Sequence, residues 1–157
     1  MKINSTEIKS LEPIKTIALN HVGDYQGISA AFQKLGEWAG LNGYWAKGPR
    51  MAGIYHDNPA EVPAEKLRSS ACLEDMGGME PGPAMERYET SGGKYLVMNA
   101  EVTMAEYGEA WRKIYAAAAQ QGLECDTRDH YELYISCVDG TQGDDAPWIV
   151  EFRVPVK

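Results

Sequence analysis

The two halves of the sequence correspond to each other at one constant offset, and this correspondence restricts the fold more than any other feature. The offset pairs identical residues in the two halves, namely Asn20 with Asn99, Ala31 with Ala110, Lys34 with Lys113 and Tyr55 with Tyr134. It also pairs two candidate helix N-caps, Asp24 and Thr103. We therefore predict an α+β fold built as a pseudo-twofold tandem repeat of strand, helix, strand and strand.

Hydrophobic periodicity predicts the elements of the first half. Apolar residues fall at helical spacing from Tyr25 to about Ala39, and Gly40 and Gly43 end that helix. The predicted strands of this half cover residues 12–22, 50–56 and 69–74. A glycine- and proline-rich connector follows over residues 76–86, and Tyr88-Glu89 reads either as a short strand or as its continuation.

The second half repeats this order. Thr103 and Glu106 form a T-x-x-E capping box ahead of a predicted helix over residues 104–121. The predicted strands cover residues 94–102, 130–136 and 148–156, with a Gly/Asp-rich turn over residues 139–145. We predict one domain over residues 1–157, with repeats at about 12–75 and 91–157 and a connector at about 76–90. Its antiparallel sheet would carry both helices on one face, with a ligand cleft between the repeats.

Composition excludes several classes of function. The net charge of −8 argues against binding nucleic acid, because phosphate recognition needs a basic surface. It is compatible with cationic small molecules or with mimicry of an acidic partner. The three cysteines form no CxxC pair, which indicates reduced thiols in a cytoplasmic protein. The polar N-terminus is no signal peptide, and no apolar run is long enough to span a membrane.

Motifs for cofactors and metals are missing from the sequence. It contains no P-loop, G-x-G-x-x-G or G-x-S-x-G pattern, so no cofactor is predicted. His21, His56 and His130 lack metal-ligand spacing. His56-Asp57 could form a catalytic pair, but the end of a strand followed by a turn is the simpler interpretation.

Glu132 is the most informative residue, because it lies in the middle of an aromatic strand. Alternation places Tyr131, Leu133 and Ile135 on one face, which suits packing against helices, and Glu132 and Tyr134 on the other. A carboxylate there is costly unless it has a partner or faces a wet cavity. The alternative interpretation is that Glu132 lies on a solvated sheet face.

Parity and helix position predict a Met-lined aromatic cavity around this acid. Its predicted ligand-binding residues are Glu132, Tyr55, Tyr134, Trp148, Met51, Tyr107 and Trp111. Aromatic faces attract cations, and a buried carboxylate prefers an organic cation. The competing interpretation is that helix aromatics such as Trp111 belong to the hydrophobic core.

Several motifs resemble the GyrI-like family, the effector-binding domain found in AraC- and MerR-type regulators. They are Ile54-Tyr55-His56-Asp57-Asn58-Pro59, Pro63-Ala64-Glu65-Lys66-Leu67-Arg68, Ser91-Gly92-Gly93-Lys94-Tyr95 and Tyr131-Glu132-Leu133-Tyr134. The resemblance implies a tandem-repeat, SHS2-like fold with a ligand cavity between the repeats. It also implies that Glu132 occupies the position where regulator relatives bind lipophilic cationic drugs, with Trp148 near an aromatic position of the site.

The resemblance leaves three functions open. The first is a stand-alone module that binds aromatic, often cationic compounds and contributes to multidrug tolerance and drug resistance. The second is a hydrolase that opens cyclopropane-bearing genotoxins, with Glu132 as general base and Tyr55 or Tyr134 as proton donor. The third is an inhibitor that contacts DNA gyrase. We expect the binding module, because the predicted aromatic cavity holds an acid but no recognisable nucleophile or base pair. The sequence contains no helix-turn-helix segment, so we do not expect a DNA-binding regulator.

Overall fold

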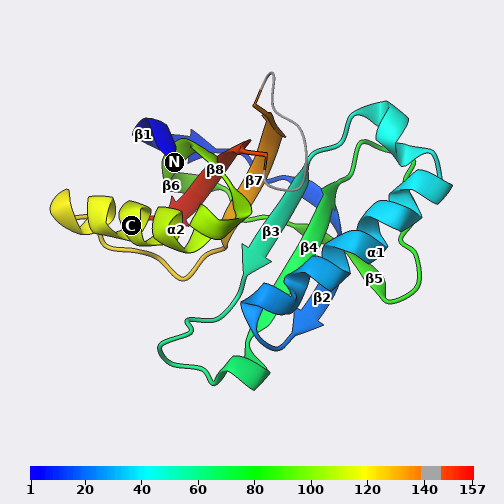
Figure 1. Ribbon diagram of the computed structural model, residues 1–157, viewed down its shortest axis with the longest axis horizontal. Helices are drawn as coiled ribbons and strands as arrows, with labels where there is room; N and C mark the ends of the chain where they lie inside the picture. Colours follow the sequence, from blue (N-terminus) through cyan, green and yellow to red (C-terminus); the bar gives the residue numbers. More distant parts are fainter. Residues whose placement is uncertain (139–145) are drawn as a thin grey trace. The chain divides into compact units, whose positions relative to one another are not determined.

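The computed structural model describes residues 1–138 and 146–157, so the predicted turn at 139–145 lies outside the described residues. The chain divides into two compact units. The first unit comprises residues 1–12 and 92–157, and the second comprises residues 13–91. Each unit combines antiparallel strands with one α-helix, which confirms the α+β class (Figure 1).

The first unit contains a sheet in the order β1-β6-β8-β7. Its strands are β1 (Lys2–Leu11), β6 (Gly93–Val102), β7 (His130–Cys137) and β8 (Trp148–Pro155), and neighbouring strands are antiparallel. One sheet face packs against α2 (Tyr107–Gln120), which buries Ala110, Ile114 and Ala118 against β6 and β8. The predicted spacing of this helix is therefore confirmed.

A capping box begins this helical segment, as the sequence predicts. It lies at a short 3₁₀ turn (Met104–Glu106), where the Thr103 backbone N–H and hydroxyl both donate to Oε1 of Glu106 at 2.9 Å. The N-terminal ammonium of Met1 donates to Oε2 of the same carboxylate at 2.6 Å. These contacts lower the pKa of Glu106 to about 2, the ammonium hydrogen bond being the largest cause.

The second unit contains a sheet in the order β3-β4-β2-β5. Its strands are β2 (Lys15–Val22), β3 (Met51–Tyr55), β4 (Arg68–Glu74) and β5 (Met85–Glu89). The helix α1 (Ile28–Leu41) follows a 3₁₀ turn (Tyr25–Gly27), and further 3₁₀ turns cover Tyr44–Lys47 and Ala64–Lys66. The face of α1 that carries Ile28, Ala31 and Leu35 packs on β2 and β4, which confirms its predicted apolar stripe (Figure 1).

The strand β1 is absent from our sequence-based prediction. Lys2–Leu11 carries no apolar stripe, and seven of its ten residues are exposed. It is held by its ladder to β6, whose register runs from Lys2 opposite Glu101 to Leu11 opposite Gly93. Hydrophobic periodicity cannot detect such a strand, because pairing rather than burial fixes its conformation.

Candidate functional site

Glu132 lies in the middle of β7 and is 1% exposed. Two neutral donors in the described part of the chain hydrogen-bond to its carboxylate. Trp111 Nε1 donates to Oε1 at 2.7 Å, and the Tyr134 hydroxyl donates to Oε2 at 2.5 Å. Tyr134 reaches the carboxylate because residues two apart in a strand share a face, whereas Trp111 comes from α2. The strand and the helix therefore position the acid together.

Aromatic rings surround this carboxylate and pack edge-on or in parallel. The Tyr107 ring stacks on Tyr134 with centroids 6.2 Å apart and meets Phe152 edge-on at 6.1 Å. Trp111 meets Phe152 edge-on at 5.4 Å. We call Glu132, Tyr107, Trp111, Tyr134 and Phe152 the Glu132 cluster. Phe152 is opposite Glu132 in the ladder between β7 and β8, a neighbour that the sequence-based site lacks because strand register is not visible in the sequence.

The electrostatics of the cluster are those of a carboxylate among neutral phenols and an indole. Burial raises the pKa of Tyr107, and the negative charge of Glu132 raises it further. Tyr107 therefore stays a neutral phenol across the physiological pH range. Its ring contributes a polarisable face and no charge to the site.

The face of β7 that meets the helix is the reverse of the predicted one. We predicted that Tyr131, Leu133 and Ile135 would pack against helices, but Glu132 and Tyr134 lie on the α2 side. Tyr131 instead packs edge-on against Tyr95. Alternation identifies two faces of a strand, but it cannot say which face a helix covers when both carry large aromatic or apolar residues.

The other predicted site residues are not among the five that define the Glu132 cluster. Trp148 begins β8, is 39% exposed and pairs with Val102 and Cys137. Met51 and Tyr55 belong to β3 of the second unit, where Tyr55 packs edge-on against Tyr25 at 4.8 Å. The structure thus brings Glu132 together with Tyr107, Trp111 and Tyr134. Ligand contacts by Trp148, Met51 and Tyr55 stay predictions.

Tyr115 packs against Trp111 and is itself within hydrogen-bond distance of His130. The Trp111 ring stacks on Tyr115 with centroids 5.8 Å apart, and the Tyr115 hydroxyl lies 2.7 Å from Nδ1 of His130. His130 Nε2 lies 2.9 Å from the Asp126 carbonyl, which can only accept. Neutral His130 therefore carries its proton on Nε2 and accepts from Tyr115. The sequence offers only a helical spacing of four residues between Trp111 and Tyr115 as a signal for this support.

The second unit contains a polar pocket of about 380 Å³, whose lining includes Asn20, His56, Arg68 and Glu86. Asn20 donates from Nδ2 to Glu86, so its Oδ1 is the group that accepts from the Ser70 hydroxyl at 2.7 Å. His56 Nε2, 2.8 Å from Ser70 Oγ, must then donate. This polarity is the reverse of that in a serine nucleophile and its base.

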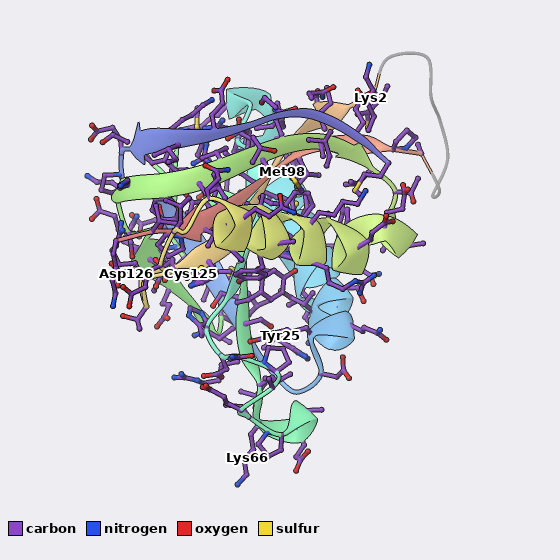
Figure 2. The ribbon with its side chains drawn as sticks, turned by 90° about the vertical axis from the view of Figure 1, so that its left-hand side faces the viewer. Lys2, Tyr25, Lys66, Met98, Cys125 and Asp126 are labelled. Atoms are coloured by element: carbon purple, nitrogen blue, oxygen red, sulfur yellow. The ribbon has the colours of Figure 1, made fainter. Side chains whose placement is uncertain are left out.

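The Asp57 carboxylate forms its hydrogen bonds with Arg68, which does not support a catalytic pair of His56 and Asp57. It accepts from the backbone N–H, Nε and Nη2 of Arg68 at 2.8–3.0 Å. The loop from Asp57 to Arg68 is thereby closed at its base, and Lys66 lies at its projecting end (Figure 2). Within residues 1–138 and 146–157, no group of three or more His, Cys, Asp or Glu side chains is placed to hold a metal ion.

Comparison with known proteins identifies the family. The sequence model of a protein family, described as the GyrI-like small molecule binding domain, matches residues 5–157. The chain belongs to the GyrI-like family. It is 30% identical over 140 residues to a DNA gyrase inhibitor of Enterobacter lignolyticus, covering 84% of this chain and 83% of that protein.

Two solved structures share the fold of this chain. The EcmrR C-terminal domain superposes with a TM-score of 0.70 at 16% identity, covering 100% of this chain and 99% of that one. SAV2435 bound to tetraphenylphosphonium superposes with a TM-score of 0.59 at 12% identity, covering 98% and 94%. At these identities the likeness establishes the fold alone.

In the described part of this GyrI-like chain, no helix is long and apolar enough to cross a membrane.

Proposed function

We propose that this GyrI-like chain binds lipophilic aromatic cations at the Glu132 cluster. The observation that carries the proposal is a carboxylate that is 1% exposed, lies among aromatic rings and accepts hydrogen bonds from the neutral donors Trp111 and Tyr134. The family description as a small-molecule binding domain supports the proposal. So does the fold neighbour SAV2435, whose structure is bound to tetraphenylphosphonium.

The chemistry of the cluster favours an organic cation over a metal ion or a neutral ligand. Removing a carboxylate from water is costly, and an organic cation offsets that cost by pairing with it. Each aromatic face adds roughly 0.5–2 kcal/mol of cation–π attraction. A hard metal ion would instead require several oxygen ligands, whereas the rings of Tyr107, Trp111 and Phe152 offer apolar surface.

Binding at Glu132 requires a local movement of the side chains around the carboxylate. Both carboxylate oxygens already accept from Trp111 and Tyr134, and the residue is almost fully buried. A cation that comes into contact with the carboxylate must therefore displace one of the side chains that cover it. Since Trp111 is one of the two donors, its fluorescence should change when a ligand binds.

Calorimetric titration with tetraphenylphosphonium chloride tests the proposal. We expect micromolar affinity and an accompanying change in tryptophan fluorescence. Glu132→Gln should weaken binding at least about tenfold, which corresponds to about 1.4 kcal/mol. Glu61→Gln removes the same charge from an exposed loop residue and should bind like the wild type. Equal affinity of Glu132→Gln and wild type would remove Glu132 from the site.

The hydrolase alternative stays a prediction, with Glu132 as general base and Tyr55 as proton donor. Mass spectrometry of a cyclopropane-bearing alkylator after incubation with the protein tests it. Addition of one water that depends on Glu132 would support hydrolysis. An unchanged compound would leave binding as the function of the cluster.

Inhibition of DNA gyrase is a further candidate function. The observation that favours it is the relative from Enterobacter lignolyticus, a DNA gyrase inhibitor that is 30% identical over most of both chains. A supercoiling assay with purified gyrase tests it directly. Inhibition that saturates with protein concentration would support this function, and unchanged supercoiling at saturating protein would remove it.

A further inference from the structure

β1 is an edge strand with an unusually exposed surface. Within the described residues of the first unit, β1 pairs with β6 on one side and with no strand on the other (Figure 2). An outer edge of this kind presents unpaired N–H and C=O groups that can template another strand. Ile8 is 46% exposed beside that edge.

The regular part of this edge is Ser5–Leu11. The register between β1 and β6 shifts between Ile3 and Ser5, which marks a bulge, and runs without interruption from Ser5 to Leu11. Bulges and charged residues normally discourage pairing between edges. Here the bulge limits the length available for pairing, and the charges define which register is allowed.

We propose that β1 pairs antiparallel with β1 of a second copy of this chain, with Ile8 opposite Ile8. This twofold arrangement places Glu7 of each copy opposite Lys9 of the other, and residues directly opposite in a sheet share a face. It therefore creates two identical cross-strand ion pairs on one face of the joined sheet and a contact between the two Ile8 side chains on the other face. Thr6 then faces Ser10, and Ser5 faces Leu11.

Charge complementarity selects this register over its neighbours. Centring the pair on Glu7 or on Lys9 would place identical charges opposite each other. Centring it on Thr6 would place Lys9 opposite Ile3, beyond the bulge. Parallel pairing in register would set Glu7 beside Glu7. In the single chain Lys9 Nζ already lies 3.7 Å from Glu7 Oε2, so both side chains extend on one face of the strand.

The size of the contact sets the expected strength. Seven paired residues bury less surface than the roughly 1,600 Å² of a standard stable interface. The dimer is therefore weak and reversible, with a dissociation constant on the order of 10–500 μM. Its formation joins two first-unit sheets edge to edge and leaves the Glu132 cluster unchanged.

Sedimentation equilibrium over a wide protein concentration range tests the proposal with a charge-swap design. Wild type should form dimers as concentration rises. Glu7→Lys alone and Lys9→Glu alone should each weaken self-association at least about tenfold, because each creates two like-charge pairs in the dimer. An equimolar mixture of the two variants should associate as heterodimers, and the double variant should recover the wild-type affinity.

Glu109→Lys is the matched control, because it makes the same charge change at an exposed position on α2. It should dimerise like the wild type. Circular dichroism of each variant verifies that the exposed substitutions leave the fold intact. A wild type that stays monomeric throughout the range, or single variants that dimerise as well as the wild type, would overturn the proposal.

Discussion

At the scale of single residues, the Glu132 cluster offsets the free-energy cost of burying a carboxylate with hydrogen bonds from specific side chains. A buried carboxylate needs donors, and Trp111 supplies one from a helix that also packs the core. Trp111→Phe keeps an aromatic ring and removes the indole donor. We expect it to lower the free energy of unfolding by about 1–3 kcal/mol, because a buried acceptor loses a partner.

A double-mutant cycle separates this hydrogen bond from the loss of packing. Trp111→Phe, Glu132→Leu and the double variant are compared by urea unfolding followed by far-UV circular dichroism. Leucine removes the acceptor at position 132, whereas glutamine would keep an amide oxygen that can still accept from Trp111. Residues that share a buried hydrogen bond couple by about 0.5–3 kcal/mol. Strictly additive effects of the two substitutions would contradict an energetic link between Trp111 and Glu132.

The pair of Asp57 and Arg68 predicts a pH-dependent contribution to stability. The Arg68 hydrogen bonds lower the pKa of Asp57 below its ordinary value of 3.8. The carboxylate therefore stabilises the fold fully above that value and loses its effect as pH falls through the lowered pKa. Asp57→Asn should lower the free energy of unfolding at pH 7 by less than about 1 kcal/mol, because Arg68 is largely exposed and solvent screens the pair. The difference from wild type should shrink towards pH 2 in urea unfolding, and a pH-independent difference would contradict this assignment.

At the scale of elements, the helices are stabilised by one face each. Leu35 of α1 is fully buried in the core of the second unit, whereas Leu41, at the end of the same helix, is 90% exposed. Leu35→Ala should lower the free energy of unfolding by about 2–5 kcal/mol, because it removes buried apolar volume. Leu41→Ala should change it by less than about 0.5 kcal/mol. Chemical unfolding of both variants measures the contrast, and equal costs would contradict the packing of α1.

The elements also explain what the sequence could and could not predict. Helix faces and caps depend on local spacing, so the stripes of α1 and α2 and the capping box at Thr103 follow from the sequence. Three other features depend on pairing between distant segments of the chain. They are the formation of a strand at β1, the position of Phe152 opposite Glu132, and the side of β7 that meets α2. Glu132 could be singled out because a carboxylate in an aromatic strand is locally improbable. The sequence could not show which of the nearby side chains donate hydrogen bonds to it. The pseudo-twofold relation between the halves and the cleft between them stay predictions.

At the scale of the whole molecule, the chain builds its first unit from two separate segments. β1 belongs to this unit, whereas residues 13–91 form the second unit before the chain returns at Gly92. The β1 ladder to β6 and the Met1–Glu106 contact are therefore long-range interactions of the first unit. Each unit keeps a hydrophobic cluster of its own, so damage to one ladder should affect the two units unequally.

Deletion of residues 1–11 tests this unequal dependence. Without β1, β6 becomes an edge strand. Leu96 and Met98 of β6, which are fully buried in the intact chain, then lose a neighbouring strand. Hydrogen exchange followed by mass spectrometry should show faster exchange in β6 and α2, because local opening there costs less free energy. Amides of α1 and β4 should keep most of their protection, since their contacts lie within residues 13–91. Equal loss of protection in both units would show that the chain unfolds as one cooperative body, whereas unchanged exchange in β6 would show that β1 contributes little to the first unit.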